Sequence, residues 1–209
     1  MNDTEARRIA HWEQVYRTRD PTALSWYQAD PAVSFRLIEQ AGVGHSGPIL
    51  DVGGGASVLA DRLLAAGYED VTVLDVSSAA LAVVGERLGP AVRVIRADVT
   101  RFEPARRHAL WHDRAVLHFL TDPEDRQAYV RTLTHALRPG GHVILATFAL
   151  DGPTRCSGLP VERYDAPRLA DLLGPAFQLR GAETETHRTP SGAAQQFQYG
   201  WFTFSEEPS

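Results

Sequence analysis

Four acidic residues follow apolar runs at intervals along the chain: Asp51, Asp75, Asp98 and Asp113. Three consecutive glycines, residues 53–55, come directly after the first of these acids. Because glycine has no side chain, a ligand can lie directly against the main chain at such a turn. A carboxylate beside the turn would repel a phosphate and attract a cation. The pattern therefore predicts a site for a nucleotide-sized ligand that carries positive charge and no phosphate.

The glycine turn departs from the dinucleotide-binding fingerprint, because the place of its last glycine is taken by Val58. S-adenosylmethionine (SAM) carries a sulfonium and an ammonium group and has no phosphate, so it satisfies both conditions. At this turn the chain resembles the class I SAM-dependent methyltransferases, whose first motif is acid-x-Gly-x-Gly-x-Gly. Asp51, Gly53 and Gly55 match that motif, and Ser57 stands where its third glycine is usual.

The resemblance also implies roles for the later acids. Asp75 lies about twenty residues beyond the turn, where a carboxylate accepts hydrogen bonds from both ribose hydroxyls. Asp98 would accept the exocyclic amine of adenine, with Val99 against the ring. Any one of these acids could instead begin a turn or cap a helix. The expected cofactor-binding residues are Asp51, Gly53, Gly54, Gly55, Asp75, Val76, Asp98, Val99 and Asp113, together with the aromatic residues Trp12, Tyr16 and Trp26.

Residues 110–118 resemble the W-D-R-G-A-L segment of the thiopurine methyltransferase family and, more loosely, a segment of some protein-lysine methyltransferases. His112 is interposed here between the tryptophan and the acid, which departs from the family pattern. Arg114 could orient a methyl acceptor, although neighbouring Asp and Arg residues are often only structural. Imidazole titrates near neutrality, so a histidine could act as a general base, or could simply be a hydrogen-bonded residue on a helix face. The expected catalytic residues are His112, Arg114 and His118.

Strand and helix patterns alternate from the glycine turn onward. Strands are expected at 49–52, 71–76, 92–98, 108–114 and 142–148, and helices at 57–66, 77–88 and from 122. A loop at 151–165 and a helix at 166–173 follow, and then two extended runs at 177–188 and 194–204. The fold class is therefore α/β: a doubly wound, mostly parallel sheet that ends in an antiparallel hairpin. The family resemblance implies seven strands and a Rossmann-like domain.

The N-terminal segment is expected to cover this sheet. Ile9, Trp12, Val15 and Tyr16 recur at helical spacing and lie on one face. We expect residues 1–45 to be a helical cap or lid of the same domain as residues 46–209, with its aromatic rings facing the SAM sulfonium.

Composition limits the partners. The formal charge of −5 argues against general nucleic-acid binding, and no apolar run is long enough to cross a bilayer. A single cysteine, Cys156, excludes an internal disulfide, so we expect a cytoplasmic protein. We expect no metal site, because no His or Cys cluster has metal-binding spacing. The chain is expected to be a monomer or homodimer.

The resulting hypothesis is a SAM-dependent methyltransferase that methylates an N, S or O atom of a small molecule and releases S-adenosylhomocysteine (SAH). One alternative is a protein (lysine-type) methyltransferase. A second, from another class, is a SAM-binding module without catalysis.

Overall fold

The computed structural model describes residues 3–206, with side chains from residue 5 onward. Its first elements are α1 (Asp3–Thr18), η1 (Pro21–Ala23), α2 (Ala32–Gln40), β1 (Ile49–Val52), α3 (Leu59–Ala65), β2 (Val71–Asp75), α4 (Ser78–Leu88), η2 (Gly89–Ala91) and β3 (Arg93–Arg96). The later elements are β4 (His108–Arg114), η3 (Leu117–Phe119), α5 (Pro123–Ala136), β5 (Leu137–Phe148), β6 (Arg155–Cys156), β7 (Leu159–Pro160), α6 (Ala166–Leu173), β8 (Phe177–Arg188) and β9 (Ala194–Phe204).

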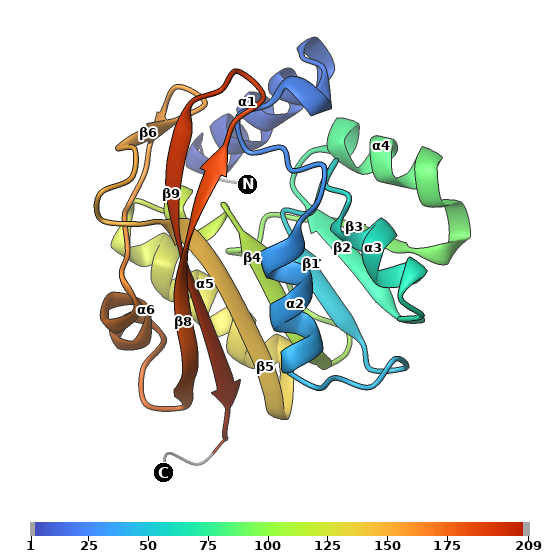
Figure 1. Cartoon of the computed structure of the whole chain (residues 1–209), viewed down its shortest axis with the longest axis vertical. Coiled ribbons are helices and arrows are strands. Elements are labelled where there is room, and N and C mark those ends of the chain that lie inside the picture. The colour runs from blue at the N-terminus through green and yellow to red at the C-terminus, as the bar shows by residue number, and fades with distance from the viewer. Residues whose placement is uncertain (1–2, 207–209) are drawn as a thin grey trace.

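Seven strands form one sheet in the order β3-β2-β1-β4-β5-β9-β8. The first five of these strands are parallel, β9 pairs antiparallel with β5, and β8 pairs antiparallel with β9. The long β8–β9 hairpin runs beside β5 in Figure 1. The predicted fold class, a doubly wound sheet finished by an antiparallel hairpin, is confirmed.

Helices cover both faces of the sheet, which explains the apolar strands (Figure 1). In β5, Val143 and Leu145 pack in the core beneath α5 and α6, whereas Ile144 and Ala146 pack in the core beneath α2, α3 and α4. This alternation follows from the two-residue period of a strand. Each face therefore has its own core.

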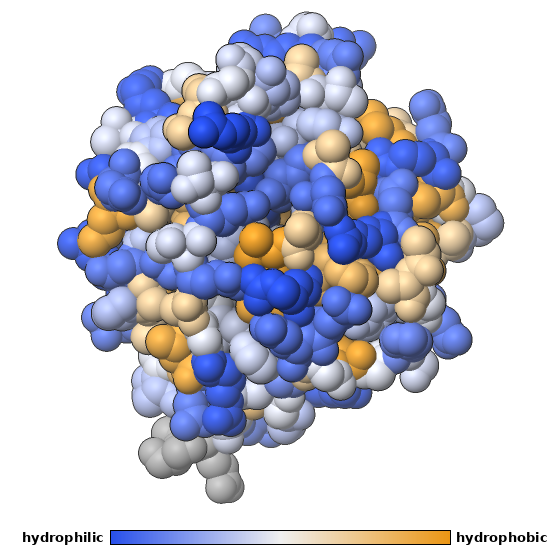
Figure 2. Space-filling model, viewed as in Figure 1, coloured by the Kyte–Doolittle hydropathy of each residue, from blue (hydrophilic) through white to orange (hydrophobic). Residues whose placement is uncertain are grey.

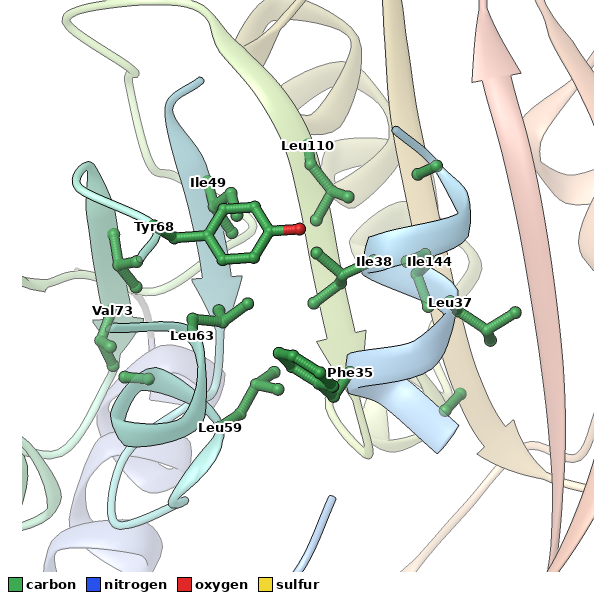
Figure 3. Close-up of a cluster of buried hydrophobic side chains, with 14 of the residues drawn as sticks. Phe35, Leu37, Ile38, Ile49, Leu59, Leu63, Tyr68, Val73, Leu110 and Ile144 are labelled. Atoms are coloured by element: carbon green, nitrogen blue, oxygen red, sulfur yellow. The ribbon is translucent and has the colours of Figure 1, made fainter. Parts of the chain in front are cut away.

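Helix α2 joins the N-terminal segment to the sheet. Its Phe35 and Ile38 point toward Leu59 and Leu63 of α3 and toward Ile49 of β1 (Figure 3). With these side chains turned inward, the face of the molecule shown in Figure 2 is mostly hydrophilic, with small apolar patches. The packing fixes α2 against α3 and β1.

Capping residues begin the helices near the site. The Ser77 hydroxyl accepts a hydrogen bond from the Ala80 amide at the start of α4, and the Asp122 carboxylate caps α5. Ser77 lies two residues after the end of β2, so this cap also orders the short connection from β2 to α4.

Two element predictions were wrong in detail, and one strand is an exception to the cover that the helices give the sheet. Strand β5 begins at Leu137, which pairs with His108 ahead of a register shift, and not at residue 142. The expected loop at 151–165 contains the short β6–β7 hairpin. Strand β3 lies at the sheet edge, where Val94 is 44% exposed, so this strand is not covered on both faces.

Candidate active site

The carboxyl ends of β1, β2 and β4 meet at one edge, because β1 pairs in parallel with both neighbours. The chain crosses over at β1, and ligands of such sheets bind at this switch point. Two cavities open there. The first encloses about 670 Å³ and the second about 560 Å³, and both volumes include their open mouths. Both are lined by Tyr16, Trp26, Val52, Gly53 and Arg114, so they adjoin.

The first cavity gathers most of the residues predicted to bind the adenosine part of SAM. Asp75 at the end of β2, Val76 after it, and Asp98 and Val99 after β3 all line it. The aromatic residues Trp12, Tyr16 and Trp26 close its other side. The sequence therefore identified residues that the fold brings together from four separate segments.

Gly53 and Gly54 line the cavities, and Gly55, which lines neither of the two, follows them in the same turn. Gly53 has φ +67°, and a Cβ there would overlap the Val116 side chain. Gly55 has φ +33°, and a Cβ there would lie 2.6 Å from the Asp75 carboxylate. Gly54 lines the second cavity, where a Cβ would overlap the Asp51 carboxylate. Each glycine thus keeps space that any other residue would fill.

Asp75 is buried at the end of β2. One of its oxygens accepts a hydrogen bond of 2.9 Å from the Ser77 amide. Burial, supplemented by the negative charges of Asp51 and Glu13, raises the pKa of Asp75 to about 7. Hydrogen-bond donors from a ligand would favour the ionised form, so this carboxyl group is suited to bind a pair of hydroxyls.

Asp98 has a partner that the sequence did not indicate. Arg8 of α1 reaches it at 2.9 and 3.0 Å and also contacts Asp125 at the start of α5. The Thr100 amide donates to the same Asp98 carboxylate. Arg8 lies 90 residues from Asp98 in sequence, so no local pattern could have revealed the pair.

Aromatic rings from the N-terminal segment enclose the first cavity. Trp12 meets Trp26 edge to face at 5.6 Å, and it meets Phe119 of η3 at 4.8 Å. Phe119, which also lines this cavity, was missed because it lies in a short helix without a periodic pattern. Glu13 accepts hydrogen bonds from Ser77 and Ser78, which ties α1 to the start of α4.

Arg114 lies between the two cavities. Its Nε donates to the Tyr199 hydroxyl at 3.2 Å and its Nη1 to the Trp26 carbonyl at 3.0 Å, while the guanidinium stacks over the Phe197 ring. Its Nη2 is 3.9 Å from Glu185. The side chain is 9% exposed, so Arg114 fixes the N-terminal segment to the sheet from a buried position.

His112 belongs to a buried polar cluster beside the second cavity. Its Nδ1 lies 2.7 Å from Asp51 Oδ1, and its Nε2 lies 2.9 Å from the Ser34 hydroxyl of α2. All three side chains line the second cavity. The other Asp51 oxygen has no hydrogen-bond partner among residues 3–206. Ser34 was missed, although a serine four residues before Ile38, on the apolar face of a helix, is a usable signal.

Two predicted site residues point elsewhere. The Asp113 carboxylate accepts hydrogen bonds from the Tyr129 hydroxyl at 2.6 Å and from the Val116 and Leu117 amides. Burial raises its pKa to about 6. Asp113 lines neither of the two cavities, so its side chain orders the loop after β4 and does not reach a cofactor there.

His118 also lies outside both cavities. It is fully buried beside Phe119 and Phe148, and its Nδ1 accepts a long hydrogen bond from the Phe148 amide. Burial, together with the charge of Arg114, lowers its pKa to about 3. His118 is therefore a neutral histidine of the core, and its position does not fit the predicted role of a base.

The Asp113 network makes a stability prediction. Tyr129→Phe removes the hydroxyl that donates to Asp113 and accepts from the Trp111 indole at 2.9 Å. We expect a loss of about 2–4 kcal/mol in the free energy of unfolding, because a buried carboxylate and a buried N–H each lose a partner. Urea denaturation measures it. Tyr68→Phe is the control, since Tyr68 is a buried tyrosine of the opposite core that packs against His45, and an equal loss in both variants would contradict the network's role.

No group of three or more metal-binding side chains occurs within the described part of the chain. Cys156 is buried, with its Sγ 4.0 Å from the Ser25 hydroxyl, and burial raises its pKa. None of the helices between residues 3 and 206 is long and apolar enough to cross a membrane.

Solved structures with the same fold cover nearly the whole chain. The Burkholderia thailandensis 1,6-didemethyltoxoflavin-N1-methyltransferase, with 1,6-didemethyltoxoflavin and SAH bound, is 22% identical with a TM-score of 0.72, covering 99% of this chain and 92% of its own. The N-methyltransferase NodS of Bradyrhizobium japonicum WM9, in complex with SAH, is 17% identical with a TM-score of 0.72, covering 98% and 100%. A structure from work on the conversion of a disulfide bond into a thioacetal group during echinomycin biosynthesis is 22% identical with a TM-score of 0.75, covering 94% and 93%.

Residues 49–141 match the protein-family model described as a methyltransferase domain, a span that begins with β1 and ends within β5. This stretch of the chain is a methyltransferase domain, and the fold around it is that of the SAH-bound methyltransferases above. The chain is therefore an enzyme of the methyl-transfer class, and SAM is the methyl donor of its family. No curated protein sequence matches this methyltransferase.

The site of this methyltransferase fits SAM on its own chemistry. The unpartnered oxygen of Asp51 is suited to a cationic group, and the three glycines leave the main chain open beside it. Asp75 and Asp98 supply acceptors along the first cavity, and no cluster of basic residues for a phosphate lines either of the two cavities. These carboxylate acceptors suit a ligand that carries a positive charge and hydroxyl groups.

Proposed function

We propose that this methyltransferase transfers the methyl group of SAM to an N, S or O atom of a small molecule. The observation that carries the proposal is the pair of adjoining cavities. The first has the predicted adenosine-binding residues, and the second has the glycine turn and Asp51, which are proposed for the methionine part of SAM. Gly53 and Arg114 line both, so SAM would span the two cavities and present its methyl group to an acceptor near Arg114 and Trp26.

Bound SAM would supply a methyl group already activated by the sulfonium. The protein's own residues then have to bind, align and exclude water. Asp75 would accept the ribose hydroxyls, with Asp98 and Val99 at the adenine, and the glycine turn would lie under the methionine part. Arg114 would hold Trp26 at the junction of the cavities and orient the acceptor.

Residues 1–45 would act as the lid of this site. Glu13 and Arg8 of the lid contact α4 and Asp98, and Arg114 of β4 donates to the carbonyl of Trp26 in the lid. Opening of α1 and the Trp26 loop would require these polar contacts to break, whereas the apolar packing of α2 against α3 would keep the lid attached.

The enclosure of the site supports a small acceptor. Trp26 and Tyr27 of the lid and Leu59 of α3 border the second cavity, and a folded protein surface could not enter it while they are in place. The small-molecule N-methyltransferases among the similar structures agree with this proposal.

Isothermal titration calorimetry with SAM and SAH tests the donor, and incubation with methyl-labelled SAM tests the acceptor. We expect label in the small-molecule fraction of a cell extract. Label in the protein fraction alone would favour a protein-methylating enzyme. Binding of SAM without any SAH formed would identify a module without catalysis.

A tryptophan substitution tests the position of the sulfonium. Trp26→Leu is expected to weaken SAM binding about 2- to 30-fold more than SAH binding, because only SAM presents a cation to the ring. Calorimetric dissociation constants for both ligands give this ratio. Trp201→Leu, on the outer hairpin, is the matched control. Equal weakening of SAM and SAH by Trp26→Leu would mean that the ring provides packing alone.

A further inference from the structure

Asp98 in the first cavity is held by donors from two separate segments. Its Oδ1 accepts hydrogen bonds from the Thr100 amide at 2.9 Å, from the Thr100 hydroxyl at 2.8 Å and from Arg8 Nη1 at 3.0 Å. Its Oδ2 accepts a hydrogen bond of 2.9 Å from the same Arg8 nitrogen and from no other residue that the structure describes. The Asp98 side chain is 1% exposed, so bulk water adds little to this set of donors.

The two oxygens of Asp98 therefore differ in what they can still accept. A carboxylate oxygen has about two lone pairs. Oδ1 already meets three donors, whereas Oδ2 meets one and keeps a lone pair. Asp98 lines the first cavity, so a ligand there could donate one hydrogen bond to Oδ2 without Arg8 leaving. An N–H group, such as the exocyclic amine of adenine, suits that position.

Arg8 decides where Oδ2 lies. Both Thr100 contacts end on Oδ1, so on their own they would let the carboxylate turn about that oxygen. Arg8 Nη1 bridges the two Asp98 oxygens, and its Nη2 contacts Asp125 at the start of α5. A planar guanidinium with donors in fixed directions holds a carboxylate in one orientation. The acceptor for the amine is therefore placed by a residue of the lid.

Arg8 lies on the face of α1 that covers the first cavity. Arg8, Trp12 and Tyr16 follow one another at intervals of four residues, so they share one face of the helix, and all three line this cavity. Glu13 holds the same helix to the start of α4. Asp98 can have its Arg8 contact only while α1 is in this closed position.

We propose that Arg8 is a positioning residue for the cofactor. It holds Asp98 Oδ2 where the exocyclic amine of adenine donates to it, and it thereby couples closure of α1 to recognition of that amine. The inference rests on the adenine position in the proposed function, to which it adds a residue of the lid. Because such coupling is reciprocal, a bound adenine amine would in turn favour the closed position of α1.

Arg8 has a structural effect as well, because it places a positive charge between the carboxylates of Asp98 and Asp125. Without it the buried Asp98 carboxylate would lack a counter-charge, and α1 would open more readily. Opening would weaken all ligands that need the closed cavity by the same factor. The ratio of affinities for two ligands that differ only in the amine cancels this factor and isolates the positioning role.

The test compares SAH with its purine analogue, in which a hydrogen atom replaces the exocyclic amine, by isothermal titration calorimetry. The wild type should bind the analogue about tenfold or more weakly than SAH, because a hydrogen bond to a charged group is lost. Arg8→Ala should bind SAH at least about tenfold more weakly than the wild type does, and its preference for SAH over the analogue should fall to about threefold or less.

Arg101→Ala is the matched control. Arg101 also pairs with α1, through Glu5 at 3.3 Å, but it lines neither of the two cavities. Both affinities should stay within about twofold of the wild type.

Arg8→Lys is the second variant, in case the alanine variant does not fold. Lysine keeps the charge, but its single nitrogen lacks the fork that bridges both Asp98 oxygens and reaches Asp125, so the preference for SAH should fall at least about threefold. Thermal unfolding without ligand establishes which variants are folded.

Tighter binding of SAH by Arg8→Ala would overturn the inference, because Arg8 would then compete with the amine for Asp98. A preference for SAH that stays at the wild-type value in the folded Arg8 variants would also overturn it and would leave Arg8 a purely structural contact. Equal binding of SAH and the analogue by the wild type would overturn the adenine assignment together with the inference. A wild type that discriminates as expected but transfers no label to the small-molecule fraction would overturn the proposed function alone.

Discussion

Asp75→Ala is expected to weaken SAH binding by at least about 100-fold. Two hydroxyl groups donating to one carboxylate contribute roughly 1.5–3 kcal/mol each, and alanine removes both. The free protein should not lose stability in proportion, because its buried Asp75 carboxyl is costly to ionise. Calorimetry on the wild type and the variant measures the binding, and thermal unfolding without ligand measures the fold.

The same residue predicts how SAH binding depends on pH. With a pKa of about 7, Asp75 in the free protein binds a proton below neutrality, whereas hydroxyl donors require the ionised form. Affinity should therefore rise by up to about tenfold per pH unit as pH approaches 7, and level off above it. Asp75→Ala should abolish this slope.

The folding stability of the free protein depends on pH in the opposite direction. The folded pKa of Asp75 exceeds the unfolded value of about 4, so ionisation destabilises the free protein as pH rises from about 4 to 7. Asp61→Ala is the control, because Asp61 pairs with Arg87 and lines neither of the two cavities. Unchanged SAH binding in Asp75→Ala would contradict the ribose assignment.

Gly55→Ala is expected to reduce SAH affinity at least about tenfold and to destabilise the fold by roughly 1–3 kcal/mol. The residue has φ +33°, which disfavours a side chain. Its new Cβ would meet Asp75 at 2.6 Å, Ala80 at 3.1 Å and the Tyr16 hydroxyl at 3.3 Å. Asp75 would have to move from the position proposed for ribose binding.

Gly85→Ala supplies the matched comparison. Gly85 lies inside α4, and a methyl group added there would meet no atom within 4 Å. Alanine should therefore stabilise the helix by about 0.5–1 kcal/mol without changing SAH affinity. Chemical denaturation and calorimetry on both variants separate the two effects. A Gly55→Ala protein with wild-type affinity would show that the turn tolerates a side chain beneath the ligand.

The alternation of side chains along β4 explains which of the predicted site residues on this strand face the cavities. Trp111 packs in the core beneath α5, and Asp113, two residues on, likewise turns toward Tyr129 of α5. His112, between them, faces α2 and the second cavity. Neighbouring residues of a strand face opposite sides of the sheet, and the presence of an acid at a strand end does not indicate which side its carboxylate faces.

The sequence by itself determined the fold class, the glycine turn and the positions of Asp75, Asp98 and the N-terminal aromatic residues. Alternating strand and helix patterns are local, and parallel strands necessarily bring their carboxyl ends to one edge. Only the tertiary structure decided the partners of those residues. His112 contacts Asp51, 61 residues away in the chain, and Ser34, 78 residues away. Arg8 contacts Asp98 across 90 residues. Such contacts depend on how α1 and α2 pack over the sheet, and packing between distant segments leaves no periodic signal in the sequence.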